Sequence, residues 1–251
     1  MKKRCLITLL GIASILAACK EQPAAENQGE QEQVEQIKEP QETEQQGSKE
    51  KQVPPITEQL KKRLTDWNLA FPLWTDEESR HIGAAVTEEV NQVNIQFYKT
   101  EEPVMLNDPA LASSQKAVLL TIQRFHSTEA ANEQIGFQNY EEAGGGQIDL
   151  GHNIIGYQDA GAGSLFTSWN EGRWAIAVRT TTDAPKEGEQ LARQTVSFLE
   201  EHTLPIPHVH GSLHLDVYEQ GSLVKWQKEE LVYGLTAAAN EDLLEWAVLF
   251  K

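Results

Sequence analysis

The sequence predicts an α+β domain in which a mainly antiparallel sheet has helices packed on one face. Three features of residues 54–251 predict this fold class: short runs of alternating apolar and polar residues, turn residues between those runs, and a few longer amphipathic segments. An antiparallel sheet with one covered face gives such an alternation, because one set of side chains is buried and the next is solvated.

The chain begins with a pattern that is typical of a secretory signal. A basic patch at residues 2–4 precedes an apolar stretch from Leu6 to Ala18. This stretch is too short to span a bilayer as a permanent helix, which needs about 20 apolar residues. A basic start, an apolar centre and a small-residue end predict a signal peptide over residues 1–18.

The end of this signal, Leu16-Ala17-Ala18-Cys19, resembles the lipobox of bacterial lipoproteins. The resemblance implies that Cys19 receives fatty acyl chains such as palmitate after residues 1–18 are removed. It also implies attachment to the cell membrane, on the extracytoplasmic face. A plain signal peptide with a chance cysteine is the alternative. The other cysteine, Cys5, lies inside the signal, so the mature domain is expected to contain no disulfide.

Residues 19–53 contain the lipidated cysteine and a tract made largely of Glu and Gln. Such a composition cannot bury enough apolar surface to offset the entropy of ordering, so we expect a disordered tether. A Gln-rich interaction tail is the alternative.

The chain has a formal charge of −17, and loss of Lys2, Lys3 and Arg4 would make it −17 − 3 = −20. This charge argues against nucleic acid as a partner, because that affinity depends on basic side chains that neutralise phosphates. It also argues against electrostatic docking of the domain on an anionic bilayer. The membrane is therefore expected as a partner only through the lipid on Cys19.

The domain is predicted to begin with a helix in residues 54–71, capped by Thr57. Its apolar stripe, at spacings of four and three, consists of Ile56, Leu60, Leu64 and Trp67. Residues 93–99 alternate and predict a strand. Residues 116–125 are more apolar and predict a central strand.

The middle of the domain is predicted to contain a helix and two hairpins. Ser127 or Thr128 would cap a helix that runs to about Glu142 and ends at glycines 144–146. Residues 147–158 predict two short strands broken at residues 151–153, and residues 164–182 predict a hairpin that turns at residues 170–172.

The second strand of that hairpin has two distinct faces. Trp174, Ile176 and Val178 are expected on one side, and Ala175, Ala177 and Arg179 on the other. Asp183 and Pro185 then signal the start of a helix with a stripe of apolar residues.

The C-terminal part is predicted as a strand at residues 212–219, a hairpin at 222–238, and a helix capped by Asn240. The hairpin echoes the earlier one, with Trp226 in the place of Trp169 and residues 233–235 in the place of 176–178. This is a weak internal repeat of hairpin-plus-helix units.

The spacing of Trp169, Gly172 and Trp174, followed by Leu204-Pro205-Ile206-Pro207, resembles uncharacterised extracytoplasmic lipoproteins of Gram-positive bacteria. This resemblance names no domain family and implies nothing about activity.

Three histidines are the candidate metal ligands. His208, His210 and His214 have the spacing that places side chains on one face of a strand, and Asp216 has the same parity. Imidazoles so placed can bind Zn²⁺ or Cu²⁺. Pro205, Pro207 and Gly211 argue against a regular strand before residue 212, and exposed histidines in a linker are the alternative.

A catalytic centre is not evident in the sequence. Ser164 follows a glycine turn but lacks the Gly-x-Ser-x-Gly spacing of a nucleophile elbow. Asp149, His152 and Asp159 offer acid–base groups, yet polar residues are the default in hairpin turns. The glycines at 144–146 lack the Lys-Ser/Thr of a phosphate loop and predict a flexible connection.

Phe71, Leu73 and Trp74, next to Pro72, are the candidate binding surface, with a buried loop as the alternative. The sequence therefore predicts a non-catalytic binding or interaction module of the cell envelope, whose partner is an unidentified envelope protein or ligand. A metal-binding protein or metal-dependent hydrolase that uses the three histidines is the second hypothesis.

Overall fold

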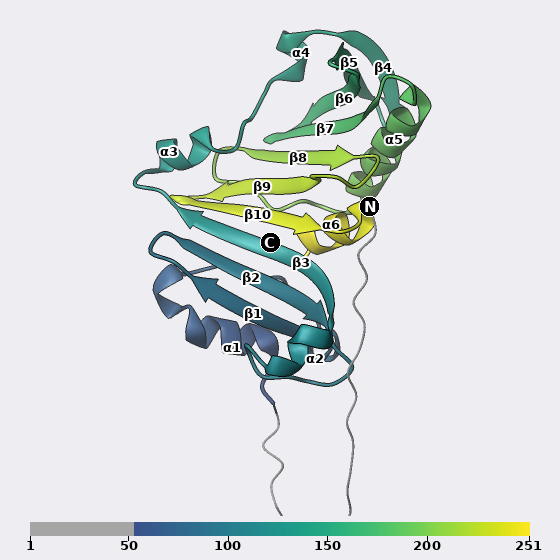
Figure 1. Ribbon diagram of the computed structural model, residues 1–251. Coiled ribbons are helices and arrows are strands. Elements are labelled where there is room, and N and C mark those ends of the chain that lie inside the picture. Colours follow the sequence, from purple (N-terminus) through teal and green to yellow (C-terminus); the bar gives the residue numbers. More distant parts are fainter. Residues whose placement is uncertain (1–52) are drawn as a thin grey trace, which may run out of the picture. The chain divides into compact units, whose positions relative to one another are not determined.

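The computed structural model describes residues 53–251, which form a mixed α+β fold dominated by one ten-stranded sheet (Figure 1). The α-helices of this part are α1 (Ile56–Arg63), α2 (Asp76–Arg80), α3 (Thr128–Glu133), α4 (Tyr140–Ala143), α5 (Pro185–Glu201) and α6 (Asn240–Ala247). The 3-10 helices are η1 (Thr65–Trp67) and η2 (Pro109–Ser113). The strands are β1 (Ile82–Glu88), β2 (Gln92–Lys99), β3 (Gln115–Arg124), β4 (Gly146–Gly151), β5 (Ile154–Gly161), β6 (Ser164–Glu171), β7 (Trp174–Thr181), β8 (Gly211–Asp216), β9 (Leu223–Lys228) and β10 (Leu231–Ala237).

The strand order is β1-β2-β3-β10-β9-β8-β7-β6-β5-β4. Three meanders make up the sheet: β1 to β3, β4 to β7, and β8 to β10. Neighbouring strands are antiparallel except for β7 and β8, which are parallel. Parallel neighbours need a long connection, and α5 provides it between β7 and β8. The mainly antiparallel sheet predicted from the alternating runs is confirmed.

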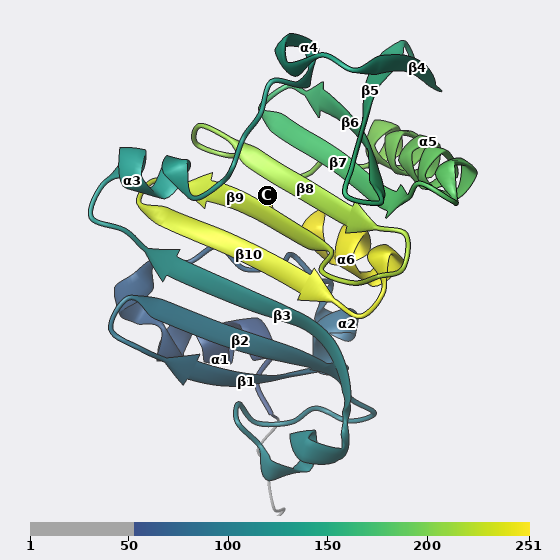
Figure 2. The ribbon, with the colours of Figure 1, turned by 45° about the horizontal axis from the view of Figure 1, so that its top comes forward.

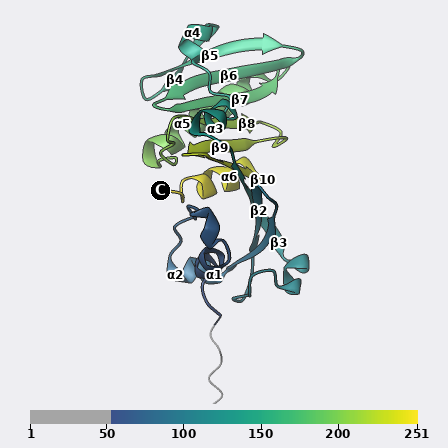
Figure 3. The same ribbon diagram turned by 90° about the vertical axis from the view of Figure 1, so that its left-hand side faces the viewer.

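The main core lies between the sheet and helices α1, α5 and α6, and Figure 3 shows α1 and α6 on one side of β2, β3 and β10. Leu60 of α1, Val196 of α5 and Leu243 of α6 are all fully buried there. Strand residues such as Ile95 and Ile176 meet them from the sheet. The helix predicted over residues 54–71 is too long, because α1 ends at Arg63 and Trp67 lies in η1. All four residues of its predicted stripe are nevertheless buried. The stripe of α5 forms because residues three and four apart share a helix face.

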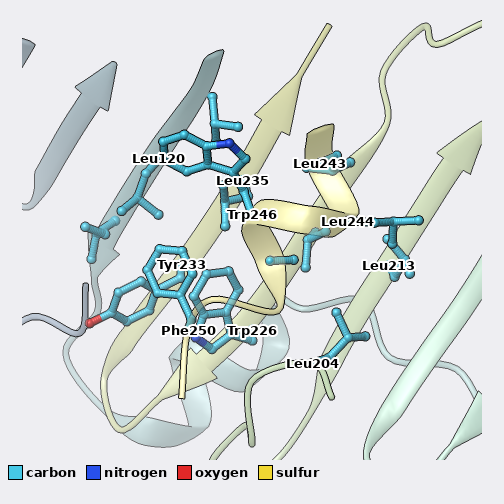
Figure 4. Close-up of a cluster of buried hydrophobic side chains, with 14 of the residues drawn as sticks. Leu120, Leu204, Leu213, Trp226, Tyr233, Leu235, Leu243, Leu244, Trp246 and Phe250 are labelled. Atoms are coloured by element: carbon cyan, nitrogen blue, oxygen red, sulfur yellow. The ribbon is translucent and has the colours of Figure 1, made fainter. Parts of the chain in front are cut away.

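An aromatic cluster joins the C-terminal hairpin to the N-terminal segment (Figure 4). Trp226 stacks on Tyr233, with ring centroids 4.9 Å apart, and meets Phe250 at 5.0 Å edge-on. The backbone N–H of Ala70 donates a hydrogen bond of 3.0 Å to the Tyr233 hydroxyl. Burial raises the pKa of Tyr233 to about 12, against the opposing effect of the Ala70 hydrogen bond.

Two short helices, α3 and α4, lie against the opposite face of the sheet. Ala131 and Ile135 pack on Val232, which alternates along β10 with the core residue Tyr233. Figure 2 shows α3 and α4 in front of the sheet, and α1, α5 and α6 behind it. The prediction that helices cover one face therefore holds for the longer helices and needs correction for α3 and α4.

The helix predicted from Ser127 to Glu142 is wrong as a single element. Ser127 does cap α3, since its hydroxyl accepts the N–H of Ala130, but α3 ends at Glu133. Gly136 has a φ of 70°, which a continuing right-handed helix cannot contain. The chain then runs on as a connection and re-forms a single turn at α4.

Two predicted caps are also wrong, and one strand was missed. Helix α1 starts after Pro55 without a side-chain cap, so Thr57 lies inside the helix. Asn240 is the first residue of α6, and its side chain instead bonds to Asp216 and Ser222. Strand β1 has little polar–apolar alternation, and its pairing with β2 holds it in the sheet.

The predicted signal, Cys19 and the tether up to residue 52 lie outside the described residues. Within residues 53–251, no helix combines the length and the apolar character that crossing a membrane requires.

Candidate ligand pocket

A cavity of about 500 Å³ opens on the sheet face opposite α5 and α6. Its wall is the segment around α4, and its floor comes from β5, β6, β7 and β8 (Figure 2). Lining residues are Gln138, Tyr140, Ala143, Gly144, Gly145, Tyr157, Asp159, Phe166, Ser168, Ala177 and His214. Residues far apart in the sequence thus meet because neighbouring strands carry them to one face.

The register of the sheet aligns the floor in a row across four strands. Tyr157 pairs with Ser168, Ser168 with Ala177, and Ala177 with His214. The two central side chains are small and the two outer ones are large rings, so the row is hollow in its middle. Side chains in such a row point to the same side of the sheet.

A second row lies beside the first and contains most of the local charge. Asp159 pairs with Phe166, Phe166 with Arg179, and Arg179 with Asp216. The ring centroids of Phe166 and His214 are 6.3 Å apart, so the two rows meet at the pocket. Phe166 and Asp159 belong to the lining, whereas Arg179 and Asp216 flank it.

The wall of the pocket is pinned to the hairpin β6–β7 by one side chain, that of Asn170. The backbone N–H of Tyr140 donates to its Oδ1 at 2.8 Å. Its Nδ2 donates to the carbonyl oxygens of Gln138 at 2.9 Å and Trp174 at 3.3 Å. Asn170 therefore holds α4 at a fixed position above the floor.

Gly145 allows the wall to pass close to β5. Its φ is +130°, and a Cβ built there would lie 2.7 Å from the carbonyl oxygen of Gln158. Any side chain at this position would collide with the backbone and strain the turn. The glycine run predicted as a flexible connection is thus the place where the pocket wall returns to the sheet edge.

An ion pair between the partly exposed Arg179 and the buried Asp216 fixes the side of the floor away from β5. The guanidinium of Arg179 donates to Oδ2 of Asp216, which is 0 % exposed, and also to the Ser164 hydroxyl at 3.0 Å. The backbone N–H of Tyr218 donates to the other carboxylate oxygen at 2.7 Å. These hydrogen bonds offset the free-energy cost of removing the Asp216 carboxylate from water.

His214 and Tyr140 are the titratable side chains whose ionisation the pocket perturbs most clearly. Burial lowers the pKa of His214, Asp216 opposes this effect, and Arg179 adds to it. Burial raises the pKa of Tyr140, against the opposing hydrogen bond with Ser168. Both shifts favour the neutral side chain, because burial penalises the charged form.

The three histidines predicted as metal ligands have separate surroundings. His208 is exposed and His210 stacks on Phe137, with ring centroids 3.9 Å apart. Nδ1 of His210 lies 3.0 Å from Oδ1 of Asn132, whereas His214 faces the pocket. Strand β8 begins only at Gly211, after the prolines. Within residues 53–251 there is no group of three or more His, Cys, Asp or Glu side chains placed to hold a metal ion.

The candidate surface around Pro72 is divided between core and solvent. Phe71 is buried, and Trp74 packs edge-on against Phe97 at 5.5 Å and Trp246 at 5.2 Å. Leu73 is 63 % exposed, and its backbone N–H donates to the carbonyl of Leu249. The two aromatic rings are therefore occupied in packing, and Leu73 is the member that faces solvent.

A smaller cleft of about 370 Å³ lies between the tip of hairpin β6–β7 and the chain that follows α5. Glu171 lines it, and burial raises the pKa of this carboxyl group. Its Oε1 accepts a 2.6 Å hydrogen bond from the indole of Trp169. Because the Glu171 carboxylate already accepts a hydrogen bond from the Trp169 indole, this cleft offers fewer free polar groups than the pocket above β5–β8.

The pocket offers aromatic faces, hydroxyl and amide groups, a neutral imidazole and one carboxylate. This set can stack on, and hydrogen-bond to, a small molecule. Comparison of the chain with protein-family models, curated proteins and solved structures finds no match. The residues and their geometry are therefore the basis for inferring a function.

Proposed function

We propose that this chain is an extracytoplasmic lipoprotein, anchored to the membrane by lipid on Cys19, and that its domain is a non-catalytic binding module. The lipobox at Leu16–Cys19 supports the anchor. The observation that carries the binding role is the pocket above β5–β8, whose volume of about 500 Å³ is typical of small-molecule sites.

The arrangement of ionisable groups favours binding over acid–base catalysis. Asp159 is on β5 and His214 is on β8, three strand spacings away in the sheet. At about 4.8 Å per spacing this separation is roughly 14 Å, which is too long for a shared proton. The same separation keeps these two side chains from coordinating one metal ion.

Lipidation is tested by expressing the full chain in bacteria fed with an alkyne-tagged fatty acid. We expect the tag on the wild-type chain and its loss in Cys19→Ser, together with release of the chain from the membrane fraction. Cys5→Ser is the matched control and should keep the tag, since Cys5 lies inside the signal. Continued labelling of Cys19→Ser would overturn the anchor.

We also infer that the domain contains an internal repeat of hairpin-plus-helix units, β6–β7–α5 and β9–β10–α6. The cross-strand pairs support this inference: Trp169 pairs with Ile176 in the first hairpin, and Trp226 pairs with Tyr233 in the second. Both tryptophans are buried on the core side.

A further inference from the structure

The charge of the pocket lining is one-sided. Among its lining residues, all within residues 53–251, Asp159 is the charged carboxylate, and none is Lys or Arg. The guanidinium in the adjoining row, that of Arg179, is held by Asp216 and Ser164. A positively charged ligand group would thus meet a carboxylate without a competing lysine or arginine in the lining.

Three aromatic rings from three different elements line the same cavity. Tyr140 comes from α4, Tyr157 from β5, and Phe166 from β6. The faces of such rings carry negative electrostatic potential and attract ammonium and guanidinium groups. Rings from several elements are suited to surrounding a cationic head, and the wall holding Tyr140 is fixed by Asn170.

The remaining polar lining is compatible with a cation. His214 is half-buried, and burial lowers its pKa, so the imidazole stays neutral near pH 7 and does not repel positive charge. Ser168 and Gln138 supply uncharged oxygen acceptors. The formal charge of −17 on the whole chain adds a long-range field that concentrates cations.

We propose that the pocket above β5–β8 binds a small organic cation whose ammonium group lies against Tyr140, Tyr157 and Phe166 and within reach of Asp159. This inference rests on the proposed function, because it names the ligand class for the same pocket. The neutral His214 and Ser168 would then contact the uncharged part of the ligand.

Three probes of nearly the same shape test this inference on the purified full chain: choline, its neutral isostere 3,3-dimethyl-1-butanol, and the anion 3,3-dimethylbutyrate. Binding is measured as Kd by ligand-observed NMR at low salt. We expect choline to bind most tightly and the anion least tightly. Asp159→Asn should weaken choline binding about fivefold, as expected for loss of a solvent-exposed charge contact, and leave the alcohol unchanged.

Two further variants complete the experiment. Tyr157→Leu removes one ring and should weaken choline more than the alcohol. Glu201→Gln removes an exposed carboxylate at the end of α5, on the other face of the sheet, and should change neither. Asp159 is exposed, so its variant should fold normally.

The outcomes separate the two proposals. Equal or tighter binding of the alcohol or the anion, weakened by Tyr157→Leu, would overturn the cation inference and keep the pocket as a ligand site. Choline binding that ignores Asp159→Asn and Tyr157→Leu would place the cation elsewhere and overturn the inference. If none of the three probes binds, the cation inference is overturned, whereas the proposed binding module, which names no ligand class, is not.

Discussion

His214 shows how one residue of the floor links the pocket to the stability of the domain. Its side chain is half-buried, lines the pocket, and is close enough to Arg179 and Asp216 for both charges to affect its pKa. Burial disfavours the imidazolium, Asp216 favours it, and Arg179 disfavours it, with a lowered pKa as the net result. The unfolded chain, in which the ring is hydrated, therefore binds the proton more readily than the folded one.

This difference predicts a pH dependence of the free energy of unfolding. The stabilising effect of a neutral His214 is complete above the unfolded pKa of about 6.5 and is lost as the pH falls through the lower folded value. In His214→Asn, stability should therefore fall less between about pH 7 and pH 5.5 than in the wild type. Urea unfolding at several pH values measures this.

His210 provides a second case of the same sign, because burial and then Arg173 lower its pKa. His210→Asn should flatten the pH dependence as well, and the double variant should flatten it further.

The imidazole signal of His214, followed by NMR, should titrate below the ordinary histidine value. If the free energy of unfolding of His214→Asn depended on pH as steeply as that of the wild type, burial of His214 would not contribute to the pH dependence of stability.

Helix α4 is too short to be stable by itself, and its place depends on contacts to the sheet. A single turn gains little from its own hydrogen bonds, because nucleation is costly. Asn170 binds the chain before and at the start of α4, and Gly145 lets it return over β5. The wall of the pocket is thus an element whose position is set by two residues outside the helix.

Replacement of Asn170 tests this dependence. In Asn170→Ala, the Tyr140 N–H loses its acceptor, and its hydrogen exchange should accelerate about fivefold, the effect of one hydrogen bond worth about 1 kcal/mol. Asn170→Asp keeps the Oδ1 acceptor and loses the two Nδ2 hydrogen bonds, so Tyr140 should be better protected than in Asn170→Ala and less than in the wild type. Mass-spectrometric exchange over residues 138–145 measures both. Equal protection in all three chains would mean that other contacts hold α4.

Elements with a strong period were predictable, and those shaped by tertiary contacts were not. Val93, Ile95 and Phe97 alternate, and β2 buries all three. By contrast, the break at Gly136 and the turn at α4 depend on the fit of the segment to Val232 and Asn170. Strand β1, with its Gly83 and two alanines, is specified by pairing to β2 more than by its own pattern.

The pocket was not predictable from any local pattern, although one signal for it is present in the sequence. The two faces of β7 were predicted correctly, with Trp174, Ile176 and Val178 in the core. Small residues on the other face, Ala177 above all, indicate a hollow when the strand is central. The register that places His214 and Tyr157 in the same row as Ala177 depends on strand pairing, and no local sequence pattern predicts it.

One sheet connects the pocket to the far edge at β1. The C-terminal meander is the link, since β10 pairs with β3 and β8 pairs with β7. Helices α1, α5 and α6 close the same core over it. Because the strands and helices share this core, the domain is expected to unfold as one cooperative unit.

Trp226 tests whether the domain unfolds as one unit, because it lies in the C-terminal meander that links the two ends of the sheet and is 2 % exposed. Trp226→Ala should lower the free energy of unfolding by about 3–5 kcal/mol, through lost burial and the cavity left beside Tyr233 and Phe250. Leu73→Ala is the matched control: its side chain is 63 % exposed, so the cost should stay below about 0.5 kcal/mol. Urea unfolding followed by far-ultraviolet circular dichroism and by fluorescence of the remaining tryptophans measures both. If the core is shared, the two signals should shift together to lower urea in Trp226→Ala, because Trp174 lies on β7 and Trp74 packs on Phe97 of β2, in different parts of the sheet. Two separate transitions would instead mean that the sheet consists of two independently stable halves.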